Sequence, residues 1–169
     1  MPKDRETELF YHVDGSDNPL GSITRKEAHS NKELIHRSVY IVIRNSQNQL
    51  LFQKRSSHKD TYPNHWALGV AGHVTFGQSY EESAIREVGE EIGKNVKVSF
   101  VTSMLLKMPE ETEICSIFES EKLDLEKFNY DKDEVSKLKW IDLKDLAMFI
   151  RQNSMTPDTL TVLAKLGYV

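Results

Sequence analysis

One stretch, Gly72 to Gly93, constrains the fold of this 169-residue chain more than any other. Ser79 is followed three residues later by Glu82, a capping-box pair that predicts a helix beginning at Tyr80. Gly93 predicts the end of that helix, because glycine readily adopts the left-handed conformation that follows many helices. The sequence therefore predicts a single capped helix after a loop that is rich in glycine.

Three carboxylates of this helix, Glu87, Glu90 and Glu91, fall on one face because residues three and four apart are neighbours on a helix. Their mutual repulsion weakens an isolated helix, whereas a hard divalent cation would use them as ligands. A solvated acidic face is the alternative. The glycines of the preceding loop favour a ligand site, since they let the backbone approach a ligand and the helix N-terminus suits phosphate.

The stretch resembles the signature box of Nudix hydrolases, which reads glycine, five residues, glutamate, seven residues, and then Arg-Glu-apolar-x-Glu-Glu-x-Gly-apolar. The residues that match at this spacing are Gly72, Arg86, Glu87, Val88, Glu90, Glu91 and Gly93. Gln78 stands in place of the first glutamate, and Lys94 in place of the last apolar residue. Glutamine still hydrogen-bonds but ligates a cation weakly, so we expect the fold to survive and full activity to be in question.

The resemblance implies roles for the box residues. In Nudix enzymes the matching glutamates bind Mg²⁺ or Mn²⁺, so the expected metal ligands are Glu87, Glu90 and Glu91, here called the box carboxylates. The backbone carbonyl of Gly72 is expected to join them. Arg86 is expected to pair with a box glutamate and orient it, and both Arg86 and Glu90 are expected to serve catalysis. Divalent cations suit this chemistry because they neutralise phosphate oxygens and lower the pKa of a bound water.

Similarity beyond the box, over roughly residues 8–145, resembles the isopentenyl diphosphate isomerase branch of the superfamily. In the isomerase, three histidines and two glutamates hold a metal ion. The matching residues, here called the His/Glu set, are His29, His36, His73, Glu111 and Glu113. Imidazoles with carboxylates suit a transition metal, Mg²⁺ or Mn²⁺, although a lone histidine is more often a structural residue. The set is a candidate second metal site.

Ala71 occupies the place of the isomerase's catalytic cysteine, and Cys115 lies elsewhere. Isomerases also characteristically lose the box carboxylates except the one that matches Glu91, whereas this chain keeps all three. Both differences favour a hydrolase over an isomerase.

The remaining chemistry is expected from two loops. Arg55 and Lys59 match basic positions that bind the diphosphate in the isomerase, so both are expected to bind phosphate through charge-assisted contacts. Nudix enzymes often supply the base for the attacking water from a separate loop. Glu134, in the acidic loop before residues 137–143, is the first choice here, with a solvated acidic loop as the alternative.

Charge and composition exclude several classes of protein. The net charge of −4 gives no electrostatic case for a nucleic acid polymer as partner. Cys115 is the only cysteine, so no intrachain disulfide forms and a reducing, cytoplasmic setting is expected. The charged N-terminus does not read as a signal peptide, and no run approaches the ~18 apolar residues of a membrane helix.

The order of predicted elements indicates an α+β fold, because strands and helices are mixed without regular alternation. The Nudix resemblance implies an α/β/α sandwich with a central mixed sheet. We expect an N-terminal arm or hairpin over residues 1–34, packed on a Nudix domain over residues 35–169. The predicted elements are a hairpin in 8–24, a helical turn in 25–29, a hairpin of 38–44 with 49–55, strands 66–74, 96–108, 112–120 and 137–143, a loop 121–134, and helices 143–153 and 157–167.

The chain is interpreted as a metal-dependent Nudix hydrolase that cleaves the diphosphate linkage of a nucleoside diphosphate-type substrate with metal-activated water. An isopentenyl diphosphate isomerase is one alternative. A non-catalytic nucleotide-binding module is another, motivated by Gln78. The expected partner is a small-molecule diphosphate, not a membrane, and a homodimer through the N-terminal arm is left open.

Overall fold

The computed structural model describes residues 5–124 and 128–169. Residues 1–4 of the predicted arm and 125–127 of the predicted loop lie outside the described residues. The strands are β1 (Leu9–Val13), β2 (Pro19–Thr24), β3 (Ile35–Val42), β4 (Leu50–Arg55), β5 (Trp66–Leu68), β6 (Val70–His73), β7 (Val98–Lys107), β8 (Thr112–Ser120) and β9 (Val135–Ile141). The helices are α1 (Arg25–Ser30), α2 (Tyr80–Ile92), α3 (Leu146–Gln152), which follows a 3₁₀ turn, and α4 (Pro157–Lys165).

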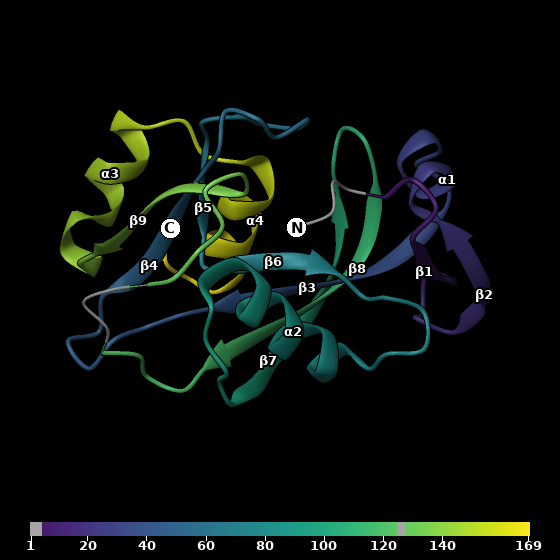
Figure 1. Ribbon diagram of the computed structural model, residues 1–169, viewed down its shortest axis with the longest axis horizontal. Coiled ribbons are helices and arrows are strands. Elements are labelled where there is room, and N and C mark those ends of the chain that lie inside the picture. The colour runs from purple at the N-terminus through teal and green to yellow at the C-terminus, as the bar shows by residue number, and fades with distance from the viewer. Residues whose placement is uncertain (1–4, 125–127) are drawn as a thin grey trace.

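A six-stranded mixed sheet forms the centre of the molecule, with the order β2-β1-β3-β8-β7 and with β6 paired to β3. β3 and β8 run parallel, and the other pairs are antiparallel. A smaller antiparallel sheet has the order β5-β4-β9. In Figure 1, α2 lies across β3, β6 and β7, while α3 and α4 are grouped with the smaller sheet. The predicted α+β fold, a mixed sheet flanked by helices, is confirmed.

Strand β3 separates two parts of the core, because successive side chains of a strand point to opposite faces. Val39 and Ile41 pack in the cluster that includes α2, and Tyr40 and Val42 pack in the cluster that includes α3 and α4. All four side chains are at most 2% exposed. The apolar side of α2, which includes the buried Val88, therefore anchors this helix to the central sheet.

Helix α2 begins and ends where the sequence predicts. The Ser79 hydroxyl accepts from the Glu82 amide at 3.1 Å, and the Glu82 carboxylate accepts from the Ser79 amide at 2.7 Å. At the other end, Gly93 has a φ of 68° and its amide donates to the Gly89 carbonyl at 3.1 Å. Both ends are determined by neighbours in the sequence, which explains why local signals located them.

The predicted hairpin of residues 38–44 and 49–55 is confirmed at its turn only, and the rest of the two strands does not pair. The first strand belongs to the central sheet and the second to the smaller sheet, and they meet near their turn at the isolated bridge between Arg44 and Leu50. β3 pairs along its whole length with β8, and β4 pairs with β5 and β9. Tertiary pairing therefore overrides the local turn signal.

The predicted single strand 66–74 divides at Gly69. Its first part, β5, pairs with β4, and its second part, β6, pairs with β3. Gly69 has a φ of 56°, and a Cβ at this position would overlap the carbonyl oxygen of Ile41. A glycine is thus required where the chain passes from the smaller sheet to the central sheet. As a result, Gly72 and His73 lie in β6, beside β3 of the central sheet.

The other predicted elements agree with the structure. β1 and β2 form the N-terminal hairpin, Thr24 caps α1, and β7 pairs antiparallel with β8. The described parts of the predicted loop 121–134 contain no helix. At α4, Thr156 occupies the N-cap position before Pro157, but its hydroxyl donates to the Thr159 hydroxyl at 2.9 Å instead of capping an amide.

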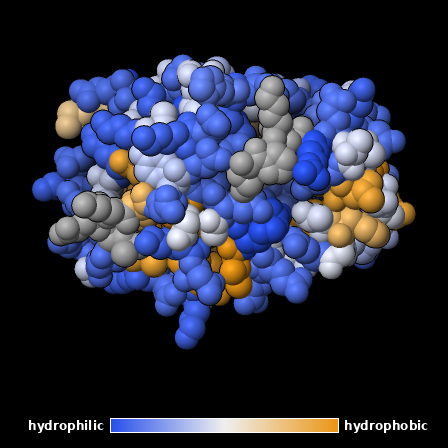
Figure 2. Space-filling view, in the orientation of Figure 1, coloured by the Kyte–Doolittle hydropathy of each residue, from blue (hydrophilic) through white to orange (hydrophobic). Residues whose placement is uncertain are grey.

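The surface of the described residues is mostly hydrophilic in the view of Figure 2. Hydrophobic surface gathers over the β1–β2 hairpin, whose Leu9 and Leu20 are exposed. No helix within residues 5–124 and 128–169 is long and apolar enough to cross a membrane. A homodimer through the arm stays a prediction.

Candidate functional site

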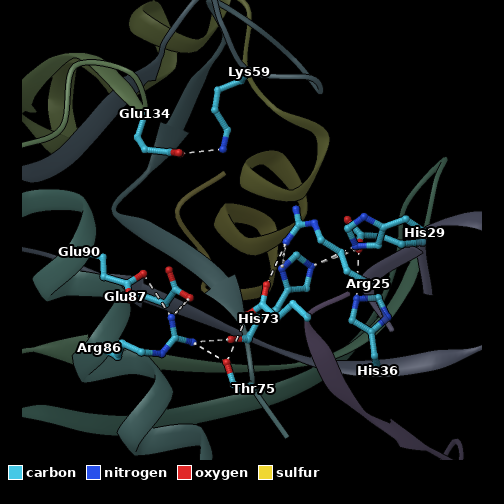
Figure 3. A network of polar contacts seen from close by, with 12 residues as sticks. Arg25, His29, His36, Lys59, His73, Thr75, Arg86, Glu87, Glu90 and Glu134 are labelled. Atoms are coloured by element: carbon cyan, nitrogen blue, oxygen red, sulfur yellow. Dashed lines mark hydrogen bonds and ion pairs between the residues drawn. The ribbon is translucent and has the colours of Figure 1, made fainter. Parts of the chain in front are cut away.

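The functional face of α2 is organised by Arg86. Its Nη1 lies 2.8 Å from Glu87 Oε1 and 3.3 Å from Glu90 Oε2. Its Nη2 donates to the backbone carbonyl of His73 at 3.0 Å. Figure 3 shows the guanidinium between these carboxylates on one side and His73 with Thr75 on the other. Arg86 pairs with two box carboxylates, the arrangement that the resemblance implied, and it also links them to the loop through the His73 carbonyl.

Gln78 makes a similar link between the loop and the helix. Its Oε1 accepts from Arg86 Nε at 3.1 Å and from the Ser83 hydroxyl at 3.0 Å. The amide oxygen thereby holds the arginine in place without a negative charge. The departure from the Nudix box at this position therefore preserves the structural tie.

Gly72 lies directly against Glu87. A Cβ at Gly72 would overlap the Glu87 carboxyl group, so a larger residue here would displace that side chain. The glycine therefore permits the close approach of the carboxylate to the loop backbone.

Two of the box carboxylates are shielded from water and electrostatically coupled. Removal from water raises the pKa of Glu87 to about 7, although Arg86 opposes the shift. Burial and the charge of Glu87 raise the pKa of Glu91 to about 8, although Gln53, Lys59 and Arg55 oppose this. Such carboxylates need a proton or a cation for neutralisation, and Mg²⁺ or Mn²⁺ would fit this oxygen-rich donor set. Glu90 is more open, with 38% of its side chain exposed.

Gln53 is a site residue to which the sequence assigned no role. Its Nε2 donates to Glu91 Oε2 at 2.6 Å and to the Gly69 carbonyl at 2.9 Å. Alternation along β4 places Gln53 and Arg55 on the same face, which is the signal that could have marked it. The alternation indicates a role in the site only once the fold shows that Gln53 of β4 contacts Glu91 of α2.

The His/Glu set forms a second cluster of potential ligands. Glu111 Oε2 lies 2.7 Å from His29 Nε2, 3.1 Å from His36 Nε2 and 3.3 Å from His73 Nε2. Glu113 Oε1 lies 3.4 Å from His36 Nε2 and 3.3 Å from His73 Nε2. In Figure 3 the three imidazoles point toward one another. The structure therefore brings together all five residues of the set.

The donor atoms of this set suit a metal ion. Single ligand atoms of His29, His36, His73 and Glu111 all lie within 4.8 Å of one another. Burial would lower the pKa of His73, but hydrogen bonds to Glu111 and Glu113 outweigh it and raise the pKa to about 10. At Glu111, hydrogen bonds from His29, His36 and His73 outweigh burial and hold the pKa of that carboxyl well below its usual range. A divalent cation could take the place of the protons that these groups share.

The remaining predicted residues lie at the end of β4, which carries Arg55, and on two loops, which carry Lys59 and Glu134. Lys59 Nζ contacts Glu134 Oε2 at 2.7 Å, a pair visible at the top of Figure 3. Arg55 donates through Nε and Nη2 to the Thr61 carbonyl, at 3.0 Å and 2.9 Å. The expected base and one expected phosphate-binding cation are therefore paired with each other.

The position of the isomerase cysteine is filled by Ala71, which packs against the core cluster beside α4. Cys115 is buried, and burial raises the pKa of its thiol well above the usual value. A buried, protonated thiol is a poor acid–base partner at neutral pH. Cys115 therefore offers no replacement for the missing cysteine.

A mixed sheet whose glycine loop leads into a capped acidic helix defines an α+β domain of the Nudix type. The chain belongs to the Nudix family, since the model of the NUDIX domain matches residues 34–164. The expectation of a Nudix-type pyrophosphohydrolase, a hydrolase acting on acid anhydrides, is confirmed at the level of enzyme class. Nudix hydrolases generally use divalent metals.

Several relatives support this assignment. Isopentenyl-diphosphate Delta-isomerase 2 of Photorhabdus laumondii is 30% identical over 159 residues, which cover 92% of this chain and 87% of the relative. A prenyl-diphosphate phosphatase of Methanosarcina mazei is 32% identical over 146 residues, covering 82% and 81%. An uncharacterized Nudix hydrolase of Pseudomonas aeruginosa is 41% identical over 88 residues, and the chain spans 52% of its length. The similarity to the isomerase branch is thereby confirmed.

The fold is also found among solved structures. A crystal structure of a Deinococcus radiodurans protein superposes with a TM-score of 0.80 at 24% identity, covering 94% of this chain and 98% of that protein. At this identity the likeness supports the fold alone.

Proposed function

We propose that this protein hydrolyses a diphosphate linkage of a small molecule with the help of Mg²⁺ or Mn²⁺. One observation carries the proposal: Glu87 and Glu91 are two shielded, mutually repelling carboxylates on a rigid helix beside a glycine loop. An arrangement of this kind costs free energy in the absence of a compensating cation.

The chain's own residues take distinct roles in this proposal. Arg86 fixes the orientation of Glu87 and Glu90, and the Gly72 carbonyl is an additional oxygen ligand beside them. A bound divalent cation would neutralise phosphate oxygens and lower the pKa of the attacking water. Arg86 lies close enough to this region to stabilise the negative charge that develops on phosphate oxygens, and Glu90 would serve catalysis as a ligand of the cation.

The end of β4 and the two loops with Lys59 and Glu134 supply substrate binding and the base. Lys59 and Arg55 bind the anionic oxygens of the substrate, a role supported by their electrostatic influence on Glu91. Glu134 accepts the proton of the attacking water, and its contact with Lys59 supports this placement. The oxygen of the attacking water forms the new bond to phosphorus, the bond from that phosphorus to the bridging oxygen breaks, and the leaving phosphate or phosphate ester departs with the bridging oxygen.

A second cation belongs, in this proposal, to the His/Glu set. The convergence of three Nε2 atoms on Glu111 supports it, because neutral imidazoles and carboxylates together ligate divalent metals. His73 adjoins Gly72 in β6, so the two ligand sets share one strand. The arm over residues 1–34 supplies His29, and we propose that it is part of one structural unit with residues 35–169.

The group attached to the diphosphate has two candidates. A nucleoside diphosphate-type substrate follows from the Nudix resemblance. A prenyl diphosphate is favoured by the prenyl-diphosphate phosphatase and the isomerase among the relatives. Isomerase activity itself is disfavoured by Ala71 and by the buried thiol of Cys115. The substrate is a soluble small molecule in a cytoplasmic setting, with neither a membrane nor a nucleic acid polymer as partner.

The test is phosphate release from a panel of nucleoside diphosphate derivatives and prenyl diphosphates, with Mg²⁺, Mn²⁺ or EDTA. Turnover that requires a cation and is lost in Glu91→Gln supports the proposal. Absence of turnover over the whole panel, with nucleotide binding intact, overturns it in favour of a binding module. Interconversion of allylic isomers without phosphate release would instead indicate an isomerase.

A further inference from the structure

Phe10, in the N-terminal hairpin, stacks against two histidines of the His/Glu set, whose rings also lie beside each other. The centroid of its ring lies 4.5 Å from that of His73, with an interplanar angle of 12°, and 5.3 Å from that of His36, with an angle of 17°. Phe10 is fully buried. It lies in β1, before the residues that match the family model, so the box and its surroundings do not indicate it.

The two stacked imidazoles direct Nε2 toward the same carboxylates. His36 and His73 each place Nε2 within 3.4 Å of both Glu111 and Glu113. Rotation of either ring about its Cβ–Cγ bond would drive the ring edge into the face of Phe10. The stacking contact therefore restricts the rotation that would turn Nε2 away from the shared centre.

At His36, no hydrogen bond of Nδ1 within the described residues fixes the ring plane, so a different contact must restrict the rotation of the ring. A histidine that ligates a metal usually donates its second ring nitrogen to a carboxylate or a carbonyl, which fixes the ring plane. His36 Nδ1 is buried and has no hydrogen-bond partner among the described residues. The usual orienting contact is thus missing at His36, and the flat face of Phe10 occupies the position from which the plane can be held.

We propose that Phe10 is a positioning residue for metal binding at the His/Glu set, which acts by stacking on His36 and His73 and fixing the direction of their Nε2 atoms. The inference rests on the proposed metal role of this set. It makes the N-terminal hairpin a contributor to the metal centre through Phe10 as well as through His29 on α1. A divalent cation that accepts imidazole nitrogen is the ligand class.

The competing interpretation is that Phe10 only fills the small apolar cluster that it forms with Ile23 and Ala28. Ile23 distinguishes the two, because it lies opposite Phe10 in the β1–β2 pairing and belongs to the same cluster. Ile23 has no ring, so Ile23→Ala removes core volume beside Phe10 while keeping Phe10, His36 and His73, the three partners of the stacking. It is a matched control for Phe10→Leu, which removes the flat ring and keeps an apolar side chain.

The experiment titrates Co²⁺ into the full chain after removal of metals with EDTA, and follows the visible absorption of the bound ion. Phe10→Leu is expected to weaken Co²⁺ binding about 10- to 100-fold and to change the absorption spectrum, as substitution of an orienting neighbour of a ligand does. Ile23→Ala is expected to bind Co²⁺ like the unaltered protein. Thermal unfolding of the metal-free proteins reports the loss of core packing in both variants.

Three results would overturn the proposal. Unchanged affinity and spectrum in Phe10→Leu would reject it while leaving the metal site standing, and so would equal losses in Phe10→Leu and Ile23→Ala. Co²⁺ binding that is insensitive to His29→Ala would place the ion outside the His/Glu set and reject the metal role as well. If Phe10→Leu does not fold, Phe10→Met provides the same comparison with a side chain of greater length.

Discussion

Lys59 Nζ lies 2.7 Å from Glu134 Oε2, so a proposed phosphate-binding cation and the proposed base form one ion pair. Their side chains are 15% and 26% exposed, and the Ser56 amide donates to the Glu134 carbonyl at 3.0 Å, which joins the two loops. A diphosphate would offer Lys59 a competing anion of higher charge. We therefore expect substrate binding to draw Lys59 away and leave the Glu134 carboxylate able to accept a proton.

Glu134→Gln tests the proposed base. The amide cannot accept the proton of the attacking water, so kcat is expected to fall about 10²- to 10⁴-fold with little change in KM. Steady-state phosphate release measures both constants. Asp133→Asn is the matched control, since the Asp133 side chain is 84% exposed and belongs to the same loop. Similar losses in both variants would indicate a general charge effect of the loop and not a base.

Lys59→Gln tests the phosphate contact. Loss of a charge-assisted contact to the substrate is expected to raise KM by about tenfold, consistent with a charged hydrogen bond of about 1.5–3 kcal/mol. Lys54→Gln is the control, because it removes the same charge. Strand alternation places Lys54 on the face of β4 opposite to Gln53, which contacts Glu91, so Lys54 points away from the site. A KM that rises equally in both variants would point to net charge alone.

How much the sequence predicts depends on the range of the contacts involved. Both ends of α2 were predicted correctly, because Ser79, Glu82 and Gly93 act on their own neighbours. The predicted pairing of residues 38–44 with 49–55 holds only at the turn, because β3 pairs along its length with β8, which lies more than 70 residues away in the chain. A local turn signal contains no information about so distant a strand.

The candidate site likewise contains residues that the sequence identified and residues whose roles appear only in the fold. Membership of the His/Glu set came from resemblance to a family, since its residues lie on α1, β3, β6 and the start of β8 and no local spacing joins them. Gln53 received no role, because its meaning depends on the contact with Glu91 from another element. Phe10 received no role from the sequence, because its stacking on His73 appears only in the folded chain.

Gly72→Ala tests the close approach of the loop to α2. The added methyl group would overlap the Glu87 carboxylate, so we expect weaker binding of Mn²⁺ and a loss of about 1–3 kcal/mol in the free energy of unfolding. Gly89→Ala is the matched change within α2. Its Cβ would come no closer than 3.8 Å to the Lys94 carbonyl, so it should stabilise the helix by about 0.5–1 kcal/mol. Urea denaturation and Mn²⁺ titration measure the two effects, and equal stability of the two variants would contradict the proposed overlap.

Glu91→Gln tests whether the buried charge of Glu91 lowers the stability of the folded chain. The test compares stability at two pH values. Burial and Glu87 raise the pKa of Glu91 from its ordinary 4.5 to about 8 in the folded chain. Between these values the folded state holds a proton that the unfolded state has lost, so stability attributable to Glu91 falls as pH rises. With EDTA present, Glu91→Gln should therefore gain stability relative to the unaltered protein as pH rises, on the order of 2–4 kcal/mol.

The measurement is urea denaturation at about pH 5.5 and about pH 8.5. Addition of Mn²⁺ at the higher pH supplies the control, because a bound cation should stabilise the unaltered protein and have a smaller effect on Glu91→Gln. A stability difference between the two proteins that is constant across pH would show that Glu91 is not shielded as described.

Gln78→Glu tests whether the departure from the Nudix box limits activity. Gln78 Oε1 already accepts from Arg86 Nε and from the Ser83 hydroxyl, so a carboxylate would repeat these two contacts. We expect kcat/KM to change by no more than about threefold, because the interaction that orients Arg86 is present in both proteins. Gln78→Leu is the contrasting variant, since it removes the acceptor and should lower both activity and stability, the latter by about 1–3 kcal/mol. A rise in kcat/KM of tenfold or more in Gln78→Glu would assign the missing charge a direct part in catalysis, beyond the tie between loop and helix.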